Sequence, residues 1–151
     1  MNSLKNILLT GGAGYIGSNT ALSLIDKGYS VTILDSLVTG NSFLIPKEAD
    51  FIKADIADEK IIKEILNRKK YHALLHFAGF IKVDESMKFP EKYYENNSKK
   101  TAILIDNCIK YGLKNIIFSS SAAVYGNAKS ILVDEETKLN PLNPYAKSKA
   151  F

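Results

Sequence analysis

Cysteine and arginine are nearly absent from this chain of 151 residues, which has one of each, Cys108 and Arg68. A single cysteine excludes an intrachain disulfide and any metal site built from several cysteines. The net charge of +4 comes from lysines, which are scattered in runs of no more than two. A nucleic-acid-binding face requires clustered Lys and Arg, so these charges indicate a solvated surface and no nucleic-acid partner.

Long hydrophobic runs are missing too, and no apolar stretch approaches the roughly 18 residues that cross a bilayer. Because residues 1–5 lead directly into a predicted strand, we expect no signal peptide, no membrane partner and a cytoplasmic location. Apolar residues nevertheless make up 46% of the chain. That fraction is typical of a soluble globular protein, and at this length it suffices for one domain with a substantial core.

Short apolar segments alternate with helical patterns along the whole chain. The predicted strands are Asn6–Leu9, Val31–Leu34, Asp50–Lys53, Ala73–Phe77 and Asn115–Ser119. The predicted helices run from the glycines after the first strand to Lys27, from Asp58 to Asn67, from Pro90 to Tyr111 and onward from Pro144. Buried strands joined by helices imply a parallel sheet covered on both faces, with ligands at the carboxyl ends of the strands. The predicted fold class is α/β, a Rossmann-type doubly wound sheet of about five strands. Residues 36–49 are a predicted loop with room for a short helix, and residues 126–142 are a predicted loop.

Three glycines, Gly11, Gly14 and Gly17, stand at intervals of three between the first strand and the first helix. The first permits a tight turn, the second lets the backbone approach a phosphate, and the third lets the helix pack closely on the strand. The start of a helix also attracts phosphate. This arrangement predicts a site for a dinucleotide pyrophosphate, with an ordinary glycine turn as the alternative.

Two aspartates follow the second and third predicted strands. Asp35 can accept hydrogen bonds from both adenosine ribose hydroxyls and would repel a 2′-phosphate, which favours NAD over NADP because no arginine follows it. Asp55 and Ile56 can hold the adenine edge, with a helix cap as the alternative role of Asp55. Cys108, among apolar neighbours on a predicted helix, is expected in the core.

Tyr145 and Lys149 are four residues apart, so they share one face of the last predicted helix. A nearby ammonium stabilises a phenolate and lowers a tyrosine pKa from its usual ~10, which makes a general acid or base usable near neutral pH. The serines at 119–121, after the fifth strand, can supply a hydroxyl that hydrogen-bonds the reacting oxygen. Each pattern is common by chance, and serines at a strand end are otherwise loop or cap residues.

Together these features resemble the extended branch of the short-chain dehydrogenase/reductase superfamily, and within it the UDP-glucose 4-epimerase family. The segments that carry the resemblance are 10–18, 33–35, 76–79, 85–86, 93–97, 118–122, 124–126 and 143–149. The resemblance implies that Ser121, Tyr145 and Lys149 form the catalytic triad. It also implies a set of residues that contact bound NAD. Beyond the three glycines these are Asp35, Asp55, Ile56, Tyr15, Ile16, Phe77, Ala78, Gly79, Asn96, Tyr145 and Lys149.

The resemblance further implies epimerisation at C4 of a UDP-hexose such as UDP-glucose or UDP-galactose. Tyr145 would take the proton of the 4-hydroxyl while hydride passes to NAD, and the 4-keto sugar would turn over before hydride returns. Another nucleotide-sugar oxidoreductase or decarboxylase of this branch, or a non-catalytic NAD-binding fragment, is the alternative. After Ser121 the Asp–Glu pair of the sugar dehydratases is missing, which argues against that reaction.

Two further positions depart from the family pattern: Ile81 stands where some members have a lysine, and Ala123 where many have a threonine. Members of this branch continue into later strands and a C-terminal substrate domain. We therefore expect residues 1–151 to be an incomplete NAD-binding Rossmann domain, inactive alone, from a homodimeric full-length protein. His72 and His76 are four residues apart, but His76 lies in or beside a predicted strand, so the two side chains should not converge on a metal ion. We therefore expect no metal site.

Overall fold

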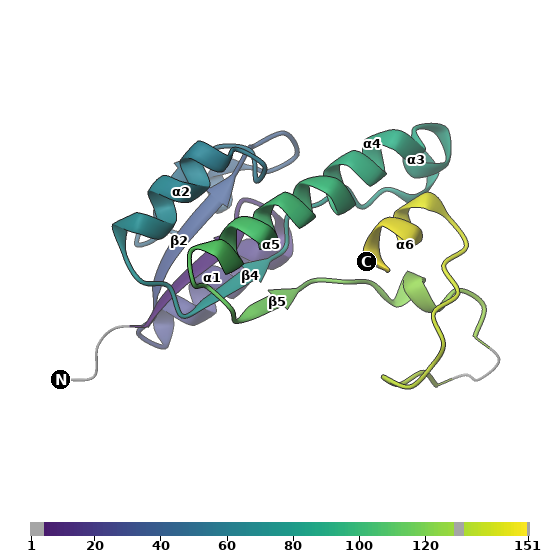
Figure 1. Ribbon diagram of the computed structural model, residues 1–151. Helices are drawn as coiled ribbons and strands as arrows, with labels where there is room; N and C mark the ends of the chain where they lie inside the picture. Colours follow the sequence, from purple (N-terminus) through teal and green to yellow (C-terminus); the bar gives the residue numbers. More distant parts are fainter. Residues whose placement is uncertain (1–4, 129–131, 151) are drawn as a thin grey trace. The chain divides into compact units, whose positions relative to one another are not determined.

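The computed structural model describes residues 5–128 and 132–150, which form two compact units. The first unit takes in the described residues up to 78 together with 101–119, and the second takes in 79–100 and those from 120 onward (Figure 1). The described residues leave out 1–4, 129–131 and 151. Parts of three predictions fall there: the one on a signal peptide, the one on the 126–142 loop and the one on the last helix.

A parallel sheet in the order β3-β2-β1-β4-β5 is the centre of the first unit (Figure 1). Its strands are β1 (Asn6–Thr10), β2 (Ser30–Asp35), β3 (Asp50–Lys53), β4 (Ala73–His76) and β5 (Ile116–Phe118). Thr10 pairs with Leu34 on one side and with His76 on the other, so the carboxyl ends of the central strands lie at one edge. The predicted Rossmann-type strand arrangement is confirmed.

Both faces of this sheet are covered, which explains why its strands are nearly continuous apolar runs. Helix α1 (Tyr15–Asp26) packs on one face, where Ala21 meets Leu9 and Ile33. On the other face lie α2 (Glu59–Arg68) and α5 (Lys100–Lys110). The buried core on that side comprises Leu8, Leu34, Ile56, Ile62, Ile65, Tyr71, Leu74, Leu104, Cys108 and Leu113. The expected core position of Cys108 is confirmed.

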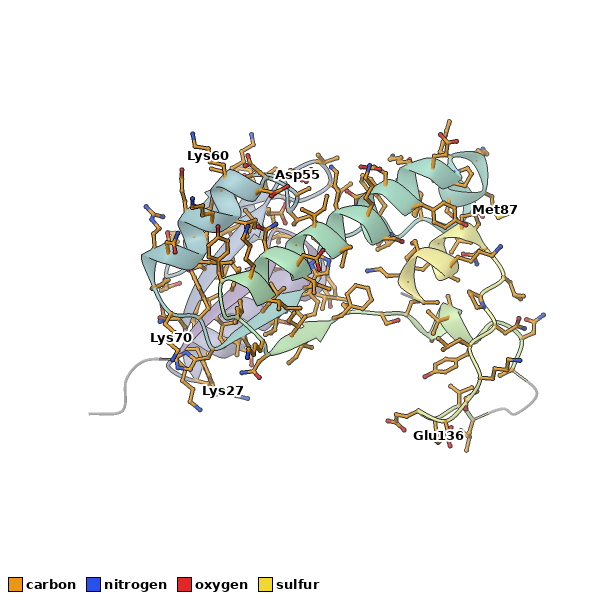
Figure 2. The ribbon with its side chains drawn as sticks, viewed as in Figure 1. Lys27, Asp55, Lys60, Lys70, Met87 and Glu136 are labelled. Atoms are coloured by element: carbon orange, nitrogen blue, oxygen red, sulfur yellow. The ribbon has the colours of Figure 1, made fainter. Side chains whose placement is uncertain are left out.

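Local sequence signals account for the ends of these helices. The Asp58 carboxylate accepts a hydrogen bond from the Ile61 N–H at 3.1 Å and so caps α2. Gly28 and Gly112 have φ of 80° and 84°, the left-handed conformation that favours glycine, directly after α1 and α5. Lysines such as Lys27 and Lys60 extend into solvent from this unit (Figure 2), consistent with a solvated surface.

The second unit is made of short helical segments: α3 (Val83–Lys88), α4 (Pro90–Tyr93), a π-helical stretch (Tyr94–Lys99), a 3₁₀ turn (Ala122–Tyr125) and α6 (Pro144–Lys149). The single helix predicted over 90–111 is a continuous helical stretch from Pro90 to Lys110. Its hydrogen bonding changes from α to π at Tyr94 and back to α at Lys100. Segment α3 was not predicted, because it is too short to show periodicity. Among the described residues of 126–142 there is no helix or strand, as predicted.

No helix within the described parts of the chain has the length and apolarity needed to cross a bilayer.

Candidate functional site

The glycine turn after β1 is tight because two of its glycines face backbone. Gly11 has φ of 74°, and a Cβ there would lie 2.5 Å from the Ala78 nitrogen. A Cβ on Gly17 would overlap the carbonyl oxygen of Gly11. These two glycines are thus required by the packing of the chain itself. Gly12, which the sequence reasoning passed over, is also required, since its Cβ would lie 2.5 Å from the Ile33 side chain.

Gly14 is different, because the protein leaves room beside it. A Cβ there would meet only the Gly11 carbonyl oxygen, at 3.3 Å. Gly14 is the N-cap of α1, no side chain caps that helix, and its first turn holds no acidic residue. An anion at this helix start would therefore meet no Cβ at Gly14 and no acidic side chain from the first turn of α1. The turn is compatible with a phosphate group, and the phosphate site inferred from the spacing of the glycines stays a prediction. Tyr15 and Ile16, which open α1, are exposed.

Asp35 ends β2 and is only 8% exposed. Its Oδ2 accepts a hydrogen bond from the Ala13 N–H at 3.0 Å, and its Oδ1 accepts one from the Leu37 N–H at 2.8 Å. A carboxylate has about four acceptor positions, so two bonds leave capacity for two more donors. This is compatible with the predicted role of Asp35 in binding a ribose diol.

Asp55 makes a local turn, in which its Oδ1 accepts a hydrogen bond from the Ala57 N–H at 2.9 Å. The helix that follows is capped by Asp58 and not by Asp55. Ile56 is buried in the core of the first unit, so a contact with adenine would have to come from its backbone. The adenine contacts of Asp55 and Ile56 stay predictions.

The end of β4 is fixed by a buried histidine. His76 lies between two threonines, with Nδ1 at Thr10 Oγ1 and Nε2 at 2.9 Å from Thr101 Oγ1, and its ring stacks on Phe118. The Phe77 N–H donates to the Thr10 carbonyl at 3.0 Å, which places Phe77 and Ala78 beside the glycine turn. His72 accepts from the Asn6 N–H instead. Over the described residues no group of three potential ligands that could hold a metal ion is found.

Helix α6 carries two of the three predicted catalytic residues, and its start is well defined. The Asn143 side chain accepts from the Ala146 N–H at 2.8 Å, and Pro144 occupies the first turn, as predicted. The Tyr145 N–H, a first-turn donor without a partner inside the helix, donates to Ser86 Oγ at 3.1 Å. The Tyr145 ring packs edge-on against Tyr93, with ring centroids 6.4 Å apart.

Tyr93 is itself held firmly. It is fully buried, its hydroxyl donates to Glu85 at 2.8 Å, and it accepts from the Lys82 N–H at 3.1 Å. Burial, reinforced by the Glu85 carboxylate, raises the pKa of Tyr93 to about 12. Tyr93 therefore stays a neutral phenol, and its hydrogen bonds hold the ring against which Tyr145 packs.

Lys149 is only 4% exposed, and burial lowers the pKa of its ammonium to about 8. A Cβ on Gly79 would lie 3.1 Å from Lys149 Nζ and 3.2 Å from Asn97 Oδ1. The missing side chain at Gly79 thus makes room for the lysine amine. With a pKa of about 8, most of these amines are protonated at neutral pH.

The three serines after β5 have different surroundings. The Ser119 N–H continues the sheet by donating to the His76 carbonyl, within the first unit. Ser120 Oγ donates to the Lys149 carbonyl at 2.9 Å, which ties this segment to the end of α6. Ser121 Oγ accepts from the Ala123 N–H at 3.2 Å and is half-buried. Ser121, Tyr145 and Lys149 all belong to the second unit.

Asn97 is a residue that sequence reasoning missed. It is 1% exposed, accepts from the Phe80 N–H at 2.8 Å, and donates to the Phe80 carbonyl and to Ser148 Oγ. Asn96, the predicted cofactor contact, donates to Asn97 Oδ1 at 3.0 Å. The role of Asn96 toward a cofactor stays a prediction. The adjacent asparagines in segment 93–97 were the only available signal for Asn97.

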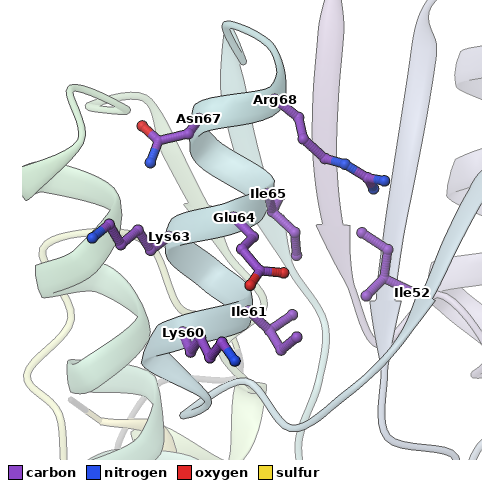
Figure 3. A pocket seen from close by; sticks show the side chains of 8 residues that line it. All are labelled: Ile52, Lys60, Ile61, Lys63, Glu64, Ile65, Asn67 and Arg68. Carbon is purple, nitrogen blue, oxygen red and sulfur yellow. The ribbon is translucent and has the colours of Figure 1, made fainter.

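The first unit also has a surface hollow of about 600 Å³ beside α2 (Figure 3). Its lining residues are Ile52, Lys60, Ile61, Lys63, Glu64, Ile65, Asn67 and Arg68. None of the predicted site residues lines it. The hollow is therefore separate from the candidate site.

Comparison with known proteins gives consistent matches. The sequence profile of the NAD dependent epimerase/dehydratase family matches residues 7–151. UDP-arabinose 4-epimerase 1 of Arabidopsis thaliana is 39% identical over 97% of this chain and 37% of its own length. UDP-glucose 4-epimerase of Lactobacillus helveticus is 41% identical over 95% of this chain and 43% of its own length.

A solved structure agrees with these matches. UDP-glucose 4-epimerase from Brucella ovis, in complex with NAD, superposes with a TM-score of 0.93 and 39% identity over 97% of this chain and 45% of that one. The chain thus spans less than half the length of each of these three proteins.

Proposed function

We propose, since this chain belongs to the NAD dependent epimerase/dehydratase family, that it is the NAD-binding and catalytic portion of a UDP-hexose 4-epimerase. The observation that carries the proposal is α6, on which Tyr145 and the buried Lys149 lie one helical turn apart. The similarity to UDP-glucose and UDP-arabinose 4-epimerases supports the same reaction type.

In this proposal the residues of the first unit hold the ADP end of NAD. Gly11, Gly14 and Gly17 shape the turn that receives the pyrophosphate, and Asp35 receives the ribose hydroxyls. The fit is supported by the room beside Gly14 and by the remaining acceptor capacity of Asp35. The remaining proposed cofactor contacts are Tyr15, Ile16, Asp55, Ile56, Phe77, Ala78, Gly79, Asn96, Tyr145 and Lys149.

The proposed catalytic residues act on the sugar 4-hydroxyl. Bound NAD supplies a hydride acceptor that also returns the hydride. Tyr145 Oη takes the hydroxyl proton as the alcohol is oxidised and gives it back when the 4-ketone is reduced on its other face. Ser121 Oγ orients the 4-oxygen. Lys149 supplies a positive charge one helical turn along α6 from Tyr145.

The complete reaction needs more than these residues. Because the relatives are more than twice as long, we propose that the nucleotide part of the sugar binds to a substrate domain outside residues 1–151, and that this chain alone does not turn over substrate. We further propose a homodimeric, cytoplasmic full-length protein. The competing proposal is that the chain is a non-catalytic NAD-binding fragment, and this agrees with the inactivity proposed for the isolated chain.

Calorimetric titration of the purified 151-residue chain with NAD and NADP tests the binding part. We expect NAD to bind at least about tenfold more tightly, because the Asp35 carboxylate repels a 2′-phosphate. A folded chain that binds neither dinucleotide would contradict the proposal. A coupled assay for conversion of UDP-galactose to UDP-glucose should show no activity, and a clear rate would contradict the inactivity of the isolated chain.

A further inference from the structure

We infer that Asp35 is also a positioning residue, whose carboxylate holds the glycine turn and the loop after β2 in the shape that receives a nucleotide. The inference rests on the proposed nucleotide binding and extends it. A ribose-binding aspartate would matter only to ligands with ribose hydroxyls. A positioning aspartate matters also to ligands that lack them.

The first line of support is Ala13, at the centre of the glycine turn. Ala13 is 1% exposed, and its N–H donates to Asp35 Oδ2 at 3.0 Å. Its carbonyl accepts from the Asn41 N–H at 2.9 Å. A buried N–H without a partner is costly, so the turn depends on a carboxylate that comes from the neighbouring strand.

The second line of support is the loop that follows β2. Leu37 has φ of 60°, a left-handed conformation that a leucine rarely adopts, and its N–H donates to Asp35 Oδ1 at 2.8 Å. Gly40 completes the closure, because a Cβ there would lie 2.7 Å from the Ala13 Cβ and 2.9 Å from Asp35 Oδ1. The loop therefore closes on the turn, with the carboxylate between them.

These contacts have a consequence for cofactor preference. Replacing Asp35 by a small neutral residue is the obvious change to admit a 2′-phosphate. Here the same replacement removes the acceptors of two backbone N–H groups, one of them in the turn itself. Such a variant should lose affinity for NAD without gaining a matching affinity for NADP.

The test compares ADP with 2′,3′-dideoxy-ADP, which has the diphosphate but no ribose hydroxyls, by calorimetry on the 151-residue chain. The variant is Asp35→Asn, and the matched control is Asp50→Asn, the same charge change at the exposed start of β3. We expect Asp35→Asn to bind dideoxy-ADP about tenfold more weakly than the unmodified chain and the control. Loss of a negative charge alone would strengthen the binding of an anion, so a decrease cannot come from charge. Undiminished binding of dideoxy-ADP would overturn the inference.

A second measurement needs no ligand. Because an asparagine side chain keeps only one acceptor oxygen for these two N–H groups, amide hydrogen exchange in the nucleotide-free Asp35→Asn chain should be at least about tenfold faster at Ala13, at Leu37 or at both. The Leu8 amide in β1 should stay protected. Unchanged exchange at both amides would overturn the inference. If the unmodified chain bound neither ADP nor NAD, the proposed function would fail, while the exchange rates would still decide whether Asp35 positions the turn.

Discussion

The same substitution at two glycines of the turn should affect two different properties, stability at Gly17 and NAD binding at Gly14. A methyl group on Gly17 would overlap the Gly11 carbonyl oxygen and lie 2.9 Å from the Gly11 carbonyl carbon and 3.0 Å from Gly12 Cα. Favourable carbon–carbon contacts are about 3.5–4.0 Å, so the start of α1 must move by several tenths of an ångström away from the turn. On Gly14 the same methyl group meets one atom, at 3.3 Å, in an extended conformation open to alanine.

The expected magnitudes follow from these contacts. Overpacking costs about 1–3 kcal/mol, or occasionally more, and the better helix propensity of alanine returns up to about 1 kcal/mol at position 17. We expect Gly17→Ala to lower the free energy of unfolding by about 2 kcal/mol, which for a chain of this size corresponds to about 4–8 °C in Tm. Gly14→Ala should change stability by less than about 1 kcal/mol but weaken NAD binding by at least about tenfold, because its methyl group occupies the space proposed for the pyrophosphate.

Urea unfolding followed by circular dichroism and calorimetric titration with NAD measure the two effects separately. The pair of variants serves as its own control, since the chemical change is identical. Gly17→Ala with an unchanged unfolding midpoint would refute the steric argument. Gly14→Ala that binds NAD like the unmodified chain would refute the placement of the pyrophosphate on this turn.

Three other outcomes can be checked. Burial lowers the pKa of Lys149 to about 8 from 10.5, so the unfolded chain binds more protons between these values and stability rises with pH across that window. The urea unfolding midpoint should therefore rise less between about pH 7.5 and about pH 10 in Lys149→Met than in the unmodified chain. An equal rise in the variant and the unmodified chain would contradict the lowered pKa of Lys149. Ser86→Ala should cost about 1–2 kcal/mol in urea unfolding, because the Tyr145 N–H loses its acceptor, and an unchanged midpoint would exclude that role. In a protein extended to the length of its relatives, Tyr145→Phe should abolish most epimerase turnover and keep the melting temperature. The control Tyr94→Phe, at an exposed tyrosine, should keep both turnover and melting temperature. Normal turnover in Tyr145→Phe would exclude Tyr145 as the acid–base group.

Much of the first unit could be predicted because its signals are local. A glycine pattern, a capping aspartate and apolar runs each act within a few residues, and they defined the turn at Gly11, the start of α2 at Asp58 and the five strands. The strand boundaries differ from the predicted ones by at most one residue at each end, because hydrogen-bonding partners on neighbouring strands decide where pairing ends.

The second unit was harder, because its organisation is tertiary. Asn96 and Asn97 are equivalent in sequence, and only the folded chain shows that Asn97 binds the Phe80 backbone. Segment α3 has six residues, fewer than two helical turns, and gives no periodic pattern.

In the first unit, the Asp35–Ala13 bond could not be predicted either, because it joins residues 22 positions apart on separate elements.

The single thiol of the chain, Cys108, can report when the core of the first unit opens. Cys108 is a residue of α5 that is buried in the core of this unit, and burial raises its pKa to about 12, so almost no thiolate is present at neutral pH. Because the thiolate is the reactive form, an aromatic disulfide reagent should label this chain only when that core opens. The labelling rate, with and without nucleotide, would then measure how far ligand binding closes the unit, without any engineered probe.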